Sequence, residues 1–269
     1  MIQLTVLPLD NGFATHLRQW QSEIDNMSGY ADRVAHGKSR FSARNTSSNA
    51  TFTHVKAVLT RMCQGARRCA YCEDSVADEV EHIKPKDLYP EAVFSWDNYL
   101  YACGPCNGPK NNKFAILEGR PTQLTIVTRP PNAAVTPPLA GKAALINPRT
   151  ENPLRFLFLD LLNTFAFTPM EGLSPDETLR AEYTLQVLRL NDRDYLVQAR
   201  RTAFGTYRAR LHEYVTEKQN GVPKLVLERR KTELLKVNHQ TVWREMQRQQ
   251  ASYAPLAALF AAAPEALIW

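Results

Sequence analysis

The stretch that decides the fold of this chain runs from Cys69-Ala-Tyr-Cys72 to Cys103-Gly-Pro-Cys106. Each Cys-x-x-Cys pair places two thiolates on one tight turn, and two such turns supply the four ligands of a tetrahedral zinc site. We predict one structural Zn²⁺ ion bound by all four cysteines. Four thiolate ligands leave no open coordination position on the zinc, so catalysis would come from other residues. A redox-active dithiol, which needs only one pair, and buried thiols with this spacing by chance are the alternatives. We expect Cys63, the fifth cysteine, to be a packed core thiol.

The segment between and after the two pairs carries side chains suited to chemistry. Glu81-His82 lies in a short strand-like run from Val80 to Ile83 that Pro85 closes. An imidazole is a good general base near neutral pH because its unperturbed pKa is about 6.5. Asn107 follows the second pair at the start of an expected helix, and a carboxylate with an amide oxygen suits a hard cation. Lys110 and Lys113 lie further along, where they could hold a phosphate backbone as point charges.

The order of these motifs resembles the HNH endonuclease family in its zinc-stapled ββα-metal form. The phrases that carry the resemblance are Cys-Ala-Tyr-Cys-Glu from residue 69, Glu-His-Ile-Lys-Pro-Lys from 81, Phe-Ser-Trp-Asp-Asn-Tyr from 94 and Cys-Gly-Pro-Cys-Asn from 103. The resemblance implies an α+β fold class, with this module embedded in a mostly α-helical chain. It also implies a metal-dependent endonuclease that hydrolyses phosphodiester bonds in nucleic acid.

Within this resemblance each functional residue has an expected role. His82 would be the general base, and Asn98 would hold the hairpin loop and the histidine. A catalytic Mg²⁺ or Mn²⁺ ion is expected between Glu81 and Asn107. These two residues stand where Asp and the last His are usual, but both keep an oxygen donor, so a hard cation is favoured over a soft one.

Hydrophobic periodicity and proline content divide the 269 residues into four parts. They are an N-terminal helical segment (1–66), the cysteine-bearing module (67–118), a proline-rich connector (119–148) and a C-terminal helical, partner-binding region (149–269). In the first part the pattern predicts one helix over 12–35, a loop over 37–49 and a second helix that stops at Gly65.

Charge and composition narrow the class of protein further. Residues 1–120 carry 14 basic and 13 acidic side chains, so most of the net charge of +6 lies in the C-terminal half and suits a polyanionic partner. For Arg200, Arg201, Arg208 and Arg210, on one predicted helix, a solvated face is favoured over a nucleic-acid track. No apolar run approaches the roughly 20 residues of a membrane helix, and no basic secretory leader opens the chain, so we expect a cytoplasmic protein.

A wider resemblance concerns the partners. The phrases Leu145-Ile-Asn147-Pro148-Arg149, Thr184–Asn191 and Pro264–Trp269 are similar to the HNH subunits that accompany an ATPase in Septu-type and retron-associated anti-phage systems, the PtuB-like family. This implies a nuclease effector in complex with an ABC-type, PtuA-like ATPase. A retron reverse transcriptase with its msDNA, and a second copy of this chain, are further candidate partners. DNA is favoured over RNA as the substrate.

Two other functions stay open from the sequence. One is a catalytically silent zinc-binding scaffold or adaptor subunit, which differs from the nuclease only in whether a cation lies between Glu81 and Asn107. The other is an autonomous, restriction-like HNH nuclease without an ATPase, which genomic neighbourhood would distinguish.

Overall fold

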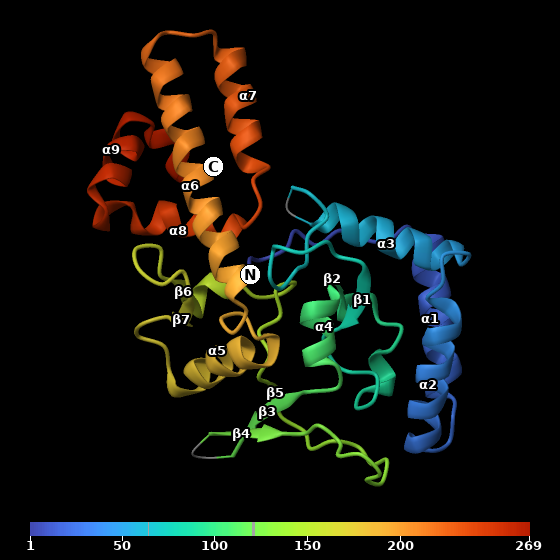
Figure 1. Ribbon diagram of the computed structural model, residues 1–269. Coiled ribbons are helices and arrows are strands. Elements are labelled where there is room, and N and C mark those ends of the chain that lie inside the picture. Colours follow the sequence, from blue (N-terminus) through green and yellow to red (C-terminus); the bar gives the residue numbers. More distant parts are fainter. Residues whose placement is uncertain (64, 120–121) are drawn as a thin grey trace.

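The computed structural model describes residues 1–63, 65–119 and 122–269, so Arg120 and Pro121 of the expected connector lie outside the description. Within these ranges helices predominate over three small antiparallel sheets (Figure 1). The predicted mixture of α and β structure is therefore confirmed. No helix in the described ranges has the length and apolar character that a membrane crossing requires.

Three helices form the N-terminal part: α1 (Asn11–Asp25), α2 (Tyr30–Arg44) and α3 (Ala50–Met62). The single helix predicted over 12–35 is wrong, because the chain breaks before Tyr30, and the loop predicted over 37–49 is helical as far as Arg44. The physical reason is a buried stripe of Val34, Gly37 and Phe41 along α2. Gly37 permits close packing, since a Cβ there would lie 3.1 Å from Cγ2 of Val93.

The cysteine-bearing module is built on a two-stranded sheet. Strand β1 (Glu79–His82) pairs with β2 (Tyr99–Ala102), and His82 lies opposite Tyr99. The loop between the strands contains two short 3-10 turns, η1 (Pro90–Ala92) and η2 (Trp96–Asn98). Helix α4 (Gly104–Lys110) begins directly after β2 and Cys103 and packs against β1.

The proline-rich part is more ordered than a connector needs to be. Its strands β4 (Gln123–Ile126) and β5 (Lys142–Ala143) flank β3 (Ala115–Glu118) in a small sheet of order β4-β3-β5. Gly141 lets the chain approach β3, because a Cβ at this position would lie 2.7 Å from Cδ1 of Ile116. Between β4 and β5 the chain runs over the surface and is mostly exposed.

The C-terminal part contains the small sheet of β6 (Leu157–Leu159) and β7 (Phe167–Pro169), followed by five α-helices in the described residues. These helices are α5 (Pro175–Leu188), α6 (Asp194–Gln219), α7 (Lys224–Leu235), α8 (Gln240–Gln249) and α9 (Ala254–Ala262). A capping box between Ser174 and Glu177 starts α5, and Arg189 in the left-handed conformation ends it. Helices α6 and α7 form a long hairpin that projects from the rest of the molecule (Figure 1).

One hydrophobic core runs through all these parts. Leu17 of α1, Tyr99 of β2, Leu188 of α5 and Phe260 of α9 belong to the same buried cluster. Arg149 extends this contact, because its buried guanidinium donates a hydrogen bond of 2.9 Å to the backbone oxygen of Tyr99. The C-terminal part therefore packs directly on the cysteine-bearing module.

Candidate metal centre and active site

The four cysteines of the two pairs meet inside the module. Their Sγ atoms all lie within 4.8 Å of one another, and all four residues are buried. The sulfurs of Cys72 and Cys103 are 3.8 Å apart, which matches the ~3.8 Å edge of a tetrahedron with zinc–sulfur bonds of about 2.3 Å. The predicted grouping is confirmed, and its geometry can hold a zinc ion.

Local backbone contacts hold the two turns in place. The amide of Ala70 donates to the backbone oxygen of Tyr101 (2.9 Å), which joins the first turn to β2. Glu73 takes the left-handed conformation that closes this turn. Hydrogen bonds among the four thiols couple their titration: they lower the pKa of Cys72 and Cys103, whereas burial, together with these bonds, raises the pKa of Cys69.

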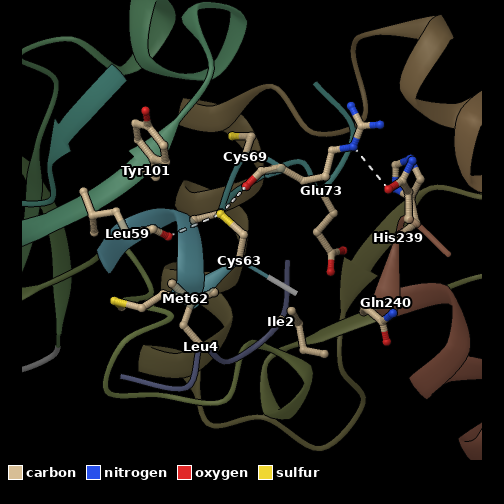
Figure 2. Close-up of a pocket in the computed structure, with 13 residues that line it drawn as sticks. Ile2, Leu4, Leu59, Met62, Cys63, Cys69, Glu73, Tyr101, His239 and Gln240 are labelled. Atoms are coloured by element: carbon tan, nitrogen blue, oxygen red, sulfur yellow. Dashed lines mark hydrogen bonds between the residues drawn. The ribbon is translucent and has the colours of Figure 1, made fainter. Parts of the chain in front are cut away.

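Cys63 stays outside the cluster. Its thiol donates to the backbone oxygens of Leu59 (3.4 Å) and Arg68 (3.3 Å), and burial raises its pKa. Figure 2 shows this thiol in a hollow between α3 and the loop before α8, where Arg68 also donates to Asn238 (3.1 Å). Cys63 is thus a packed, half-buried thiol.

His82 ends β1 in a buried, aromatic environment. Its Nε2 lies 2.9 Å from the backbone oxygen of Val93. A carbonyl can only accept, so Nε2 carries the proton, and the lone pair of Nδ1 accepts from the ammonium of Lys86 at 3.5 Å. The rings of Phe41 and Tyr99 contact the imidazole edge-on. Burial, reinforced by the positive charge of Lys86, lowers the pKa of His82 well below its ordinary value, so the ring is neutral at neutral pH.

Asn98 organises the loop that follows His82. Its Oδ1 accepts from the amide of Lys84 (2.7 Å), and its Nδ2 donates to the backbone oxygens of Lys84 (3.0 Å) and Ala92 (2.9 Å). The buried amide therefore binds both sides of the loop.

Lys110 lies in the interior, and this placement differs from the phosphate contact expected of it. Its side chain is fully buried, forms an ion pair with Glu81 and donates to the backbone oxygen of His82 (2.8 Å). The carboxylate of Glu81 recruits the ammonium because an unpaired buried charge costs several kcal/mol. By contrast, Lys113 is exposed and accessible to a phosphate.

The expected divalent-cation site does not fit this arrangement. Lys110 already neutralises Glu81, and the amide of Asn107 donates to the carboxylate of Glu79 (2.5 Å) instead of facing Glu81. Among the described residues, the four cysteines are the one group of three or more His, Cys, Asp or Glu side chains that could hold a metal. The oxygen ligands that Mg²⁺ or Mn²⁺ needs are therefore not gathered between these residues.

Part of the chain is similar in sequence to a known protein. Over 62 residues the chain is 42% identical to the Septu protein PtuB of Bacillus thuringiensis. Over this stretch the chain is thus similar to a Septu protein. The matched region covers 21% of this chain and 23% of that relative, so the chain spans about a quarter of the relative's length in the match. No protein-family model and no solved structure matches the chain.

Two cations, one beside His82 and one beside the four-cysteine cluster, were not predicted from the sequence. Lys86 is four residues beyond His82, and its Nζ donates to Nδ1 of that histidine at 3.5 Å. Arg193 of the C-terminal part donates to the sulfur of Cys106 (3.2 Å). Lys86 stands in the Glu-His-Ile-Lys-Pro-Lys phrase, so its position near His82 could have been predicted from the sequence. No local motif predicts the contact between Arg193 and Cys106.

The arginines of α6 divide into two kinds. Arg200 is buried and donates to the backbone oxygens of Phe165 (3.1 Å) and Leu190 (2.6 Å), so the solvated face predicted for it is wrong. Its guanidinium thus satisfies one carbonyl of the loop between β6 and β7 and one of the turn before α6. Arg201 and Arg208 are exposed, as predicted.

Proposed function

We propose that this protein is a nuclease of the HNH type and the nucleic-acid-cleaving subunit of an anti-phage defence complex. The observation that carries the proposal is the state of His82. It is a neutral imidazole at the end of β1, with Nε2 anchored on a carbonyl and Nδ1 facing the ammonium of Lys86. The similarity to a Septu protein PtuB supports the defence context.

The chain's own residues supply a route for phosphodiester hydrolysis. Nδ1 of His82 takes a proton from a water molecule, and the resulting hydroxide attacks the phosphorus in line. The bond from phosphorus to the 3′ oxygen breaks, and that oxygen leaves with a proton from solvent. Lys86 lies next to Nδ1 and stabilises the negative charge that develops on the phosphate oxygens. No step passes through a divalent cation, because Lys110 already pairs with Glu81.

The test of this proposal is cleavage by full-length protein of plasmid DNA and of RNA, in Mg²⁺, Mn²⁺ or EDTA. Loss of a general base removes about 10²–10⁴ in rate, so His82→Ala should lose cleavage. His212→Ala is the matched control, since that histidine is exposed on α6. Circular dichroism and zinc content establish that both variants fold, and His82→Asn repeats the test with a polar side chain. Wild-type rates in a folded His82→Ala protein would refute the nuclease mechanism.

Cation dependence forms a separate arm of the same experiment. Cleavage that persists in EDTA agrees with the Glu81–Lys110 pair as it stands. A strict requirement for Mg²⁺ or Mn²⁺ would mean that Lys110 leaves Glu81 when substrate binds, and would restore the cation site that the family resemblance implies.

A scaffold without catalysis is the second candidate function. Two observations favour it: His82 is only 3% exposed, and the carboxylate of Glu81 is occupied by an ammonium. In this case the protein forms a complex with its ATPase but cleaves neither DNA nor RNA, alone or in the complex. The cleavage assay with the co-purified complex separates the two functions.

For the partner, we place the contact with a PtuA-like ATPase on the α6–α7 hairpin. The hairpin projects from the molecule (Figure 1), and Leu225 near its tip is 82% exposed. Leu225→Asp should abolish co-elution with the ATPase, whereas Leu162→Asp, at another exposed leucine, should not. A point variant is preferable to a truncation after Ile146, because that residue is fully buried in the shared core.

A further inference from the structure

We propose that a groove between α2, the loop after His82 and the proline-rich segment binds an unpaired nucleic-acid strand. This inference rests on the proposed nuclease function and names its substrate class. The groove has a volume of about 520 Å³, and its far wall is the chain around Pro137, Pro138 and Leu139. That volume lies within the range for ligand pockets.

Aromatic rings and cations line the groove together. Tyr30 comes from α2, and Tyr89 comes from the loop after His82, where its ring packs on Phe114 at 5.2 Å. Lys84 places its ammonium 5.4 Å from the centre of the Tyr89 ring. Bases stack on such rings and backbone phosphates pair with such cations, which is how proteins bind single strands without reading their sequence.

Arg33 adds a second cation with unused hydrogen-bonding capacity. Its guanidinium lies 5.9 Å from the centre of the Tyr30 ring. Its Nε is buried and has no hydrogen-bond partner among the residues that the structure describes. A buried donor of this kind favours an acceptor, and a phosphate oxygen is the acceptor that a nucleic-acid strand offers.

The groove is joined to the proposed active site through the loop itself. Lys84 is two residues beyond His82, and both its backbone amide and its backbone oxygen are bound by Asn98. On the opposite side, the hydroxyl of Tyr30 donates to the backbone oxygen of Leu88 (2.8 Å), which ties α2 to the same loop. Two residues that line the groove, Lys84 and Tyr89, therefore belong to the loop that begins after His82.

An unpaired strand fits better than a duplex for a physical reason. The π faces of bases are covered by their neighbours in a duplex and are free in a single strand, so aromatic walls favour the latter. One charge opposes binding: Glu91 lines the groove and repels phosphate. Asp87, in the same loop, is neutralised by Lys38 and Arg129. Removing the charge of Glu91 should therefore tighten binding of the strand, whereas removing a cation should weaken it.

Fluorescence anisotropy measures the binding, with labelled oligo-dT, oligo-rU and duplex DNA of about twelve nucleotides in EDTA. We use the full chain carrying His82→Ala, so that cleavage does not interfere. Tyr89→Ala should weaken binding roughly 5- to 100-fold, because stacking contributes about 1–3 kcal/mol per base, and Tyr89→Phe should retain it. Arg33→Gln should weaken binding and reduce the salt dependence by about one phosphate contact.

Two further variants complete the design. Glu91→Gln should tighten binding, and Arg40→Gln, on the same helix as Arg33 but not lining the groove, should change nothing. Duplex bound as tightly as oligo-dT, or equal effects of Arg33→Gln and Arg40→Gln, would overturn the groove assignment. Comparison of oligo-dT with oligo-rU distinguishes DNA from RNA.

The experiments distinguish a failure of the groove proposal from a failure of the nuclease proposal. Protein that cleaves nucleic acid but is indifferent to Tyr89→Ala keeps the nuclease function and loses the groove. Protein that binds oligo-dT through Tyr89 but never cleaves keeps the groove and loses the nuclease function.

Discussion

The guanidinium of Arg193 donates a hydrogen bond of 3.2 Å to the sulfur of Cys106, although 87 residues separate them in the chain. The same side chain donates to the backbone oxygens of Leu188 (3.1 Å) and Arg189 (3.0 Å). It therefore ties the junction of α5 and α6 to the four-cysteine cluster. A positive charge beside a thiolate stabilises the thiolate, and second contacts of this kind orient metal ligands.

We predict that Arg193→Gln weakens zinc binding by about 10- to 100-fold, the usual effect of losing a contact behind a ligand. Zinc transfer to a chromogenic chelator measures this. Arg208→Gln is the control, since Arg208 is exposed on the same helix. Equal transfer from both variants would show that the contact with Cys106 has no bearing on the metal.

Removing a ligand should have a larger effect. Cys103→Ser is expected to lower zinc content from one ion per chain and to destabilise the module by several kcal/mol, on the order of the folding energy that structural zinc supplies. Mass spectrometry under native conditions and thermal unfolding measure the two effects. Cys63→Ser should keep full zinc, because that thiol contacts only backbone oxygens. Full zinc in Cys103→Ser would contradict the four-ligand site.

The Glu81–Lys110 pair lends itself to a double-mutant cycle. Lys110→Met leaves a buried carboxylate without its partner and should cost about 3–5 kcal/mol of unfolding free energy. Adding Glu81→Gln removes that charge and should recover much of the loss. Urea unfolding measures each variant, with the exposed Lys113→Met as the control. Additive effects of the two substitutions would argue against the pair.

The lowered pKa of His82 predicts a pH dependence of stability. The unfolded chain binds a proton near pH 6.5, and the folded chain binds it only at lower pH. The stability that the neutral ring contributes is thus complete above pH 6.5 and is lost as pH falls through the folded-state pKa. Thermal unfolding between pH 8 and pH 5 should show this loss in the wild type and a smaller loss in His82→Gln.

The same pKa sets the pH profile of the proposed cleavage reaction. The neutral ring is the active form, so the rate should stay level down to pH 6.5 and fall only below it. Lys86→Gln removes a positive charge that faces the ring, so the pKa of His82 should rise and the fall in rate should move to higher pH. A nuclear magnetic resonance titration of the imidazole provides a readout that does not depend on activity. An unchanged titration in Lys86→Gln would contradict the contact.

The sequence by itself determined the metal cluster and the hairpin beside it. Spacing alone predicted that Cys69, Cys72, Cys103 and Cys106 come together, because each pair is local and both pairs must satisfy one metal. The strand that ends at His82 was also predictable, since a short apolar run closed by Pro85 has few alternatives. Local chemistry governs all of these features.

Only the tertiary structure decided the partners of the buried charges. Lys110 and Lys113 have the same side chain three residues apart, yet one pairs with Glu81 in the interior and the other is exposed. The sequence could not distinguish them, because burial depends on which face of α4 meets β1. Likewise, Arg193 reaches Cys106 only because α5 and α6 pack on the module. Contacts between distant segments follow from how the whole core closes, and no local pattern records them.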